Sequence, residues 1–288
     1  MKGFLRNVAR GAYRALLPRG AKNSLRLWLL LDEPDKPPQV IDDFSVGCVL
    51  VLAPHMDDEV IGCGGTIRKH VMAGAQATVV YMTDGRRGGP QFVGAGRDHR
   101  QEIEAPSALV ERRKAEAQCG ARILGIHETM FLDRADGELE ADEPTVEALR
   151  RILLQTRPDV IYLPSVLDTH PDHWATNLVF SKAIGDAGMP DGWQPVCREY
   201  EVWTPLLPNR LVNITDVFDT KIEALKQHES QIAQVDYVHV TQGLNAYRSM
   251  NHLGGRGFAE AFAQRRPKEH RALLDRLVDD RMHTGEGH

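Results

Sequence analysis

The sequence predicts an α/β fold built from βαβ units around a mostly parallel sheet. Three observations support this prediction. Apolar, strand-like runs alternate along the chain with segments of helical periodicity. The helical segments are ten or more residues long, as the connections between parallel strands require. Polar clusters follow the strand-like runs, as expected where the carboxyl ends of parallel strands form a ligand-binding edge.

The first half of this pattern spans residues 46–124. The run VGCVLVLAP (46–54) predicts a buried strand that ends at Pro54, and helical periodicity follows over 60–73. ATVVYMTDG (77–85) predicts a second strand, because it is rich in β-branched residues and ends in an Asp-Gly turn signal. Residues 107–124 form a long amphipathic pattern followed by Gly125, which favours a helix that stops there.

The second half repeats the alternation over residues 128–184. ETMFLD (128–133) predicts a short strand, and residues 144–155, which begin at a proline, predict the next helix. PDVIYLPS (158–165) predicts a fourth strand, and helical periodicity returns over 173–184. We therefore expect a single α/β domain with appendages at its two ends.

Composition excludes several classes of protein. The 288 residues are 42% hydrophobic and 26% charged, which is enough apolar surface for a full core. A net charge of −5 argues against a nucleic-acid partner, which normally meets a broad basic surface. The cysteines form no C-x-x-C pair, so we expect neither a disulfide scaffold nor a thiolate zinc site, and we expect a reducing, cytoplasmic setting. They are Cys48, Cys63, Cys119 and Cys197.

The N-terminal 27 residues are basic, and no acidic residue precedes Asp32. Arginines spaced four apart, at Arg6, Arg10 and Arg14, would share one helical face. Two interpretations stay open: peripheral contact of residues 1–27 with anionic lipids at the inner face of a membrane, or packing on the domain or on a second copy in a homo-oligomer. We expect this arm and a Pro-rich linker over 1–40, the main domain over 41–265, and a C-terminal helix and tail over 266–288.

Two histidine motifs carry the predicted chemistry. HMDDE places His55 and Asp58 three residues apart, and HPDH places His170 and His173 at the same spacing. Imidazoles with a carboxylate are ligands that Zn²⁺ prefers, and a catalytic zinc site keeps one position open. We therefore predict a metal on His55, Asp58 and His173, with Fe²⁺ or Co²⁺ as alternatives to zinc. Asp57 would take the proton of the attacking water, and His170 would stabilise the oxyanion or protonate the leaving group.

Together, APHMDDEVIGCGGTI and DTHPDHWATN resemble the LmbE-like, or PIG-L, family of zinc-dependent N-deacetylases. ERRKAEAQCGARILGI, KIEALKQHESQI and AYRSM…GGRGFAEAF extend the resemblance over about residues 46–264. The resemblance implies a Rossmann-like, three-layer α/β/α fold. It also implies removal of an acetyl group from an N-acetylglucosamine-type glycoconjugate, with the same ligands, base and assisting imidazole.

The resemblance further suggests that Arg113 reaches the sugar or its aglycone; otherwise it is a solvated arginine paired with Glu116 or its neighbours. Some family members carry a tyrosine two residues before the first histidine of the second motif, where this chain has Asp168. We expect Asp168 to line the substrate site and to orient His170. Asp84 is expected to orient His55 or to close its turn, and Asp172 to support the ligands from behind.

Other functions remain as alternatives. The three glycines Gly62, Gly64 and Gly65 suggest a dinucleotide loop, but they do not follow the strand directly and Ile67 stands where a third fingerprint glycine belongs. A hydrolase of another amide or ester bond, or a non-catalytic binder of sugar or lipid, would also fit the two motifs. The aglycone cannot be read from the chain.

Overall fold

The computed structural model describes residues 37–89, 105–185, 190 and 192–284. The chain divides into two compact units, Met1–Pro37 and Pro38–His288, and all described helices and strands belong to the second. The predicted basic arm lies outside the described residues, as does most of the Gly- and Arg-rich loop that follows the second predicted strand. Within the described part of the chain, none of the helices has the length and hydropathy needed to span a bilayer.

One mixed sheet of eight strands runs through this unit in the order β1-β7-β8-β6-β5-β2-β3-β4. Five neighbouring strands are parallel: β2 (Cys48–Ala53), β3 (Gln76–Thr83), β4 (Glu128–Arg134), β5 (Val160–Pro164) and β6 (Val196–Tyr200). β8 (Ala259–Arg265) is antiparallel to both β6 and β7 (Arg210–Asn213), and the short β1 (Gln39–Val40) pairs parallel with β7. The predicted fold, α/β with a mostly parallel sheet, is confirmed.

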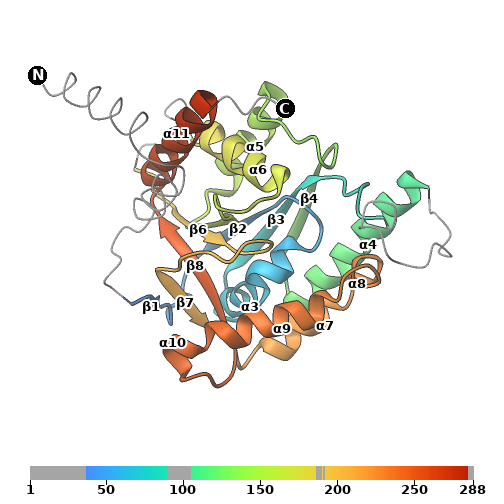
Figure 1. The fold of residues 1–288 in the computed structure, drawn as a ribbon, viewed down its shortest axis with the longest axis vertical. Coiled ribbons are helices and arrows are strands. Elements are labelled where there is room, and N and C mark those ends of the chain that lie inside the picture. The colour runs from blue at the N-terminus through green and yellow to red at the C-terminus, as the bar shows by residue number, and fades with distance from the viewer. Residues whose placement is uncertain (1–36, 90–104, 186–189, 191, 285–288) are drawn as a thin grey trace, which may run out of the picture. The chain divides into compact units, whose positions relative to one another are not determined.

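Helices cover both faces of the sheet (Figure 1). One layer holds α5 (Glu143–Thr156), α6 (Pro171–Ala183) and α11 (Pro267–Thr284). The other holds α3 (Asp58–Met72), α4 (Pro106–Leu124), α7 (Phe218–Leu225), α8 (Glu229–Ile232), α9 (Tyr237–Arg248) and α10 (Met250–Leu253). Alternate residues of β2 explain the two cores, since Val49 and Val51 join the cluster under α3 while Leu50 and Leu52 join the cluster under α5 and α6.

The four strands and four helices predicted from periodicity all exist, and their ends differ from the prediction by at most two residues. Strands β6, β7 and β8 were not predicted individually. The C-terminal helix α11 packs on β6, where the His270 imidazole contacts the Glu199 carboxylate at 3.1 Å and Leu274 is buried. The helix that follows residue 265 therefore packs directly against the sheet.

Helix α3 carries the first histidine motif and is broken at Cys63, where φ is −147°. Lys221 Nζ donates to the carbonyl of Ile61, just before the break, at 2.8 Å. The Glu260 carboxylate accepts from the backbone N–H of Thr66 and of the residue before it, at 2.8 and 2.9 Å. Lys221 and Glu260 also pair at 2.6 Å with both side chains fully buried, so one ion pair satisfies both sides of the break.

The glycines of α3 serve packing. A Cβ at Gly62 would overlap the ring of Tyr200, and a Cβ at Gly65 would lie 2.8 Å from the side chain of Ile214. These glycines therefore let α3 lie directly against the sheet, which accounts for them without a dinucleotide.

Candidate metal centre

The polar residues gather where the parallel strands end. His55 and Asp58 follow β2, Asp136 follows β4, and His170 and His173 follow β5 at the start of α6. Because β4, β3, β2 and β5 are adjacent and parallel, their carboxyl ends meet at one edge of the sheet. Pro171 begins α6, in the first turn, where the missing backbone N–H costs nothing.

The turn between β2 and α3 holds Asp57 in a strained conformation with a φ of 152°. Its backbone N–H donates to Glu59 Oε2 at 3.2 Å, and the Tyr81 hydroxyl donates to Glu59 Oε1 at 2.7 Å. Burial raises the pKa of Glu59 to about 8. Glu59, which is itself held by Tyr81, thus anchors the backbone of the strained residue.

Two of the predicted ligands, His55 and His173, lie beside one oxygen of the third, Asp58. Asp58 Oδ2 lies 3.2 Å from His55 Nδ1 and 3.2 Å from His173 Nε2. Ligand atoms bound to one tetrahedral zinc at about 2.0–2.1 Å lie roughly 3.3 Å apart, so these separations suit a shared cation. His173 Nε2 is buried and has no partner with hydrogen-bond geometry, which fits a nitrogen that directs its lone pair to a metal. The residues present therefore fit a divalent metal.

The other nitrogen of each predicted histidine ligand faces a carboxylate. His55 Nε2 lies 3.1 Å from Asp172 and 3.2 Å from Asp136, and His173 Nδ1 lies 3.2 Å from Asp168. Such carboxylates fix the tautomer of a ligating imidazole, leaving the metal-facing nitrogen unprotonated. His55 would then present Nδ1 and His173 would present Nε2 to the cation.

His170 is differently placed. One of its nitrogens lies within 4.8 Å of a nitrogen of His55 and of His173, so three imidazoles also form a candidate ligand group. However, His170 Nδ1 accepts the backbone N–H of Asp172 at 3.2 Å as the N-cap of α6. In neutral His170 the proton is then on Nε2, which makes that nitrogen a donor toward the site. This favours the predicted assisting role over ligation.

Charge in the site is dominated by carboxylates. Burial opposes ionisation of Asp58, but the charges and hydrogen bonds of His173 and His55 outweigh it and lower the pKa of Asp58 well below its usual range. Burial raises the pKa of Asp57 to about 7, although the charge of Arg113 works against that rise. Burial also disfavours imidazolium at His55, yet hydrogen bonds to Asp136, Asp172 and Asp58 raise its pKa well above normal. A site that stabilises positive charge in this way also suits a cation.

Arg113 is buried beside the predicted base. Its guanidinium donates to the carbonyls of Gly85 at 2.8 Å and Met56 at 3.2 Å, and it lies 3.6 Å from the Asp57 carboxylate. The alternative of a solvated arginine paired with Glu116 is wrong: the Glu116 carboxylate instead accepts from the backbone N–H and hydroxyl of Ser230.

Of two predicted contacts, that of Asp168 differs in the structure and that of Asp84 follows one of its two alternatives. From His170, Asp168 accepts the backbone N–H at 3.2 Å and makes no contact with the ring, whereas its other oxygen contacts the ring of His173 and the whole side chain is buried. It therefore orients the imidazole of His173 rather than that of His170. Asp84 accepts the backbone N–H of Arg86 and Asp136 at 3.1 and 3.3 Å. Asp84 thus closes its turn, while the carboxylates in contact with His55 come from elsewhere.

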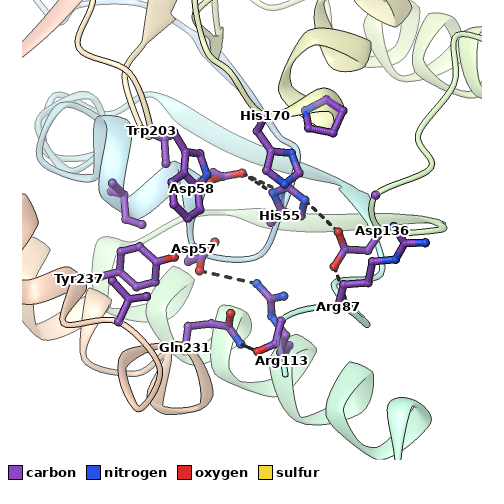
Figure 2. Close-up of a pocket in the computed structure, with 16 residues that line it drawn as sticks. His55, Asp57, Asp58, Arg87, Arg113, Asp136, His170, Trp203, Gln231 and Tyr237 are labelled. Carbon is purple, nitrogen blue, oxygen red and sulfur yellow. Dashed lines mark hydrogen bonds and ion pairs between the residues drawn. The ribbon is translucent and has the colours of Figure 1, made fainter. Parts of the chain in front are cut away.

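A cavity of about 500 Å³ opens over these residues (Figure 2). Sequence reasoning did not single out several of its lining side chains as site residues, namely Arg87, Asp136, Trp203, Gln231 and Tyr237. Asp136 and Gln231 lay in segments already noted, the polar cluster after the third predicted strand and the His-x-Ser-Gln of a later helix. Trp203 and Tyr237 gave no local signal, because neither belongs to a motif.

Residues 50–184, which contain both histidine motifs, match the family model described as PIG-L: GlcNAc-PI de-N-acetylase. The predicted family resemblance is therefore confirmed.

Several named deacetylases are similar to this chain over about two thirds of its length. The diacetylchitobiose deacetylase of Thermococcus kodakarensis is 29% identical over 198 residues, which cover 65% of this chain and 70% of that protein. The probable N-acetyl-alpha-D-glucosaminyl L-malate deacetylase 2 of Bacillus cereus is 29% identical over 195 residues, covering 64% and 83%. The structure of N,N'-diacetylchitobiose deacetylase from Pyrococcus horikoshii, in complex with its inhibitor MPG, superimposes with a TM-score of 0.65 at 25% identity. The superposition covers 88% of this chain and 94% of that structure.

Proposed function

We propose that this chain is a zinc-dependent hydrolase that removes the acetyl group from an N-acetylglucosamine-type glycoconjugate. The observation that carries the proposal is the convergence of His55, Asp58 and His173: His55 and Asp58 line one cavity together with Asp57, and the buried His173 contacts Asp58. The PIG-L match and the named activities of the relatives support the same reaction. The fold alone does not, because one fold hosts many activities.

The roles follow from the contacts. A divalent cation held by His55, Asp58 and His173 would supply an acidified water and polarise the amide carbonyl. Asp57 accepts the proton from the attacking water, since its carboxylate is aimed into the same cavity. His170 donates from Nε2 to the developing oxyanion or to the leaving amine.

Arg113 completes the arrangement as an orienting group. Its guanidinium is held by two backbone carbonyls and stands 3.6 Å from Asp57, so its positive charge is fixed beside the base and along the cavity wall. We propose that it keeps the Asp57 carboxylate in line with the substrate and reaches the sugar or its aglycone. Asp168, Asp136 and Asp172 act through the imidazoles that they contact.

The experiment is acetate release from a panel of N-acetylglucosaminyl glycosides, using protein whose metal content has been measured. Wild type should release acetate and contain about one zinc. Asp57→Ala should retain the metal and lose roughly 10²–10⁴-fold in kcat, because only the proton acceptor is removed. The exposed Asp216, which pairs with Lys69 away from the cavity, provides the matched control: Asp216→Ala should keep full activity.

The outcomes separate the alternatives. Metal-loaded protein that releases no acetate from any sugar would favour a hydrolase of another amide or ester bond, or a non-catalytic binder. Iron or cobalt in place of zinc would correct the metal and leave the reaction unchanged. Protein that binds no divalent metal would overturn the site.

A further inference from the structure

Trp203 is a large aromatic side chain that is left exposed at the cavity. It lies just beyond β6, lines the cavity, and is 53% exposed. Its ring is within 24° of parallel to that of His170, with 6.3 Å between the ring centroids. An indole in this position costs free energy in water, so its exposure beside the assisting imidazole needs a physical reason.

The backbone around Trp203 is firmly held. The backbone N–H of Trp203 donates to Asp168 Oδ2 at 3.1 Å, and the same oxygen contacts His173. Arg248 contacts the chain before and after the tryptophan. It forms a two-point ion pair with Glu201, at 2.9 and 2.6 Å, and also donates to the Leu206 carbonyl. The backbone that carries the exposed indole is therefore tied to Asp168, which contacts a candidate metal ligand.

Tyr237 completes an aromatic corner with Trp203. The two rings meet at 85° with their centroids 6.4 Å apart. Tyr237 begins α9, the helix that ends at Arg248. One helix therefore supplies both the second aromatic ring and the arginine that pairs with Glu201, two residues before Trp203. Figure 2 shows the Tyr237 hydroxyl directed toward Asp57.

The opposite wall of the cavity is polar. Arg87 and Asp136 line it, with Asp136 accepting the backbone N–H of Arg87 at 2.9 Å (Figure 2). The cavity is thus amphipathic across its width, with aromatic faces on one side and charged hydrogen-bonding groups on the other. A pyranose ring has matching chemistry, since its axial C–H groups form an apolar face and its hydroxyls lie around the rim.

We propose that Trp203, with Tyr237 at right angles to it, is the platform on which the pyranose ring that carries the scissile amide stacks. This proposal rests on the proposed function. Because His170 stands where the leaving amine departs, the group next to it is the ring that bears that amine, and Trp203 is the ring beside His170. Trp203 is then the residue that selects amides attached to a sugar over acyclic amides.

Binding can be measured without turnover. Tryptophan emission of metal-loaded Asp57→Asn is titrated with N-acetylglucosamine and, separately, with acetamide, which has the amide and lacks the ring. The sugar should shift the emission saturably and acetamide should not. The change should vanish in Asp57→Asn/Trp203→Phe and persist in Asp57→Asn/Trp193→Phe, because Trp193 donates to the Pro158 carbonyl and lines a different cavity.

Kinetics give the second measurement. In otherwise wild-type protein, Trp203→Ala should raise KM for the sugar about tenfold or more while kcat stays within about threefold, since a stacking surface worth about 1.4 kcal/mol is removed. Trp203→Phe keeps an aromatic face and should recover most of that KM. Trp203 is half exposed, so the thermal midpoint of either variant should match that of wild type.

The outcomes distinguish this proposal from the activity on which it rests. Acetate release with an unchanged KM in Trp203→Ala, or a sugar titration whose signal survives loss of Trp203, overturns the platform and leaves the deacetylase standing. A saturable, Trp203-dependent sugar signal in Asp57→Asn, together with metal-loaded wild-type protein that releases no acetate, supports the platform and overturns the deacetylase. A fall in kcat at constant KM would assign Trp203 to the chemical step and refute stacking.

Discussion

Lys221→Met should cost this protein about 3 kcal/mol of stability. Lys221 Nζ is fully buried and donates to the Ile61 carbonyl, the Asn245 side chain and the Glu260 carboxylate at 2.8, 2.9 and 2.6 Å. Removing one partner of a buried pair typically costs 3–5 kcal/mol, because it leaves an uncompensated charge. Glu260 keeps its donors from the α3 backbone, so we take the lower end of this range.

The free energy of unfolding is measured by urea titration followed by circular dichroism. For a folded unit of about this size the loss corresponds to a fall of roughly 6–12 °C in Tm. Lys69→Met is the matched control, since Lys69 pairs with Asp216, whose side chain is 61% exposed, and such a pair is worth at most about 1 kcal/mol. If Lys221→Met loses no more than Lys69→Met, the pair does not support the break in α3 and the reasoning is wrong.

Three further predictions concern other parts of the fold. Asp168→Ala should weaken metal binding about 10–100-fold in competition with a chelator, because it removes the carboxylate that orients a candidate ligand; an affinity within twofold of wild type would contradict this role. Burial lowers the pKa of His70 from 6.5 to about 4, so only the unfolded chain takes up a proton between these values and stability should fall by up to about 3 kcal/mol as pH drops through that window. His70→Gln should flatten this dependence in urea titrations at several pH values, and an unchanged slope would assign it to other groups. Gly62→Ala should destabilise by about 3 kcal/mol, because its Cβ would overlap Tyr200, whereas Gly243→Ala on α9, where no described atom lies within 4 Å of the added Cβ, should stabilise by up to about 1 kcal/mol; equal melting temperatures would refute the packing argument.

The spacing of the two motifs predicted which side chains approach one another, because both motifs are local. His55 with Asp58, and His170 with His173, lie three residues apart across the start of a helix, so the local turn of the chain brings the members of each pair together. Their meeting followed from the strand order, since β2 and β5 are direct neighbours. The metal-ligand set itself stays a prediction, to be tested by metal analysis.

The partners of those side chains were harder to predict. Asp168 was expected beside the ring of His170, two residues away, and it contacts the ring of His173 instead. Helix α6 begins at Pro171, between His170 and His173, so the backbone turns there. His170, which is nearer to Asp168 in sequence, therefore presents its backbone N–H to Asp168 rather than its ring. Asp136 contacts His55 from another strand end, and sequence distance carries no information about such a contact.

By itself, the sequence determined the alternating elements, the parallel sheet and the two histidine motifs. These depend on periodicity, turn residues and short spacings, which act within a few residues of one another. Only the tertiary structure decided the shape of the cavity, where a loop after β6 and the start of α9 place Trp203 against Tyr237. The break in α3 was also decided there, by a lysine and a glutamate from α7 and β8. Those contacts join segments far apart in the chain, and their free energy exists only once the sheet has brought the segments together.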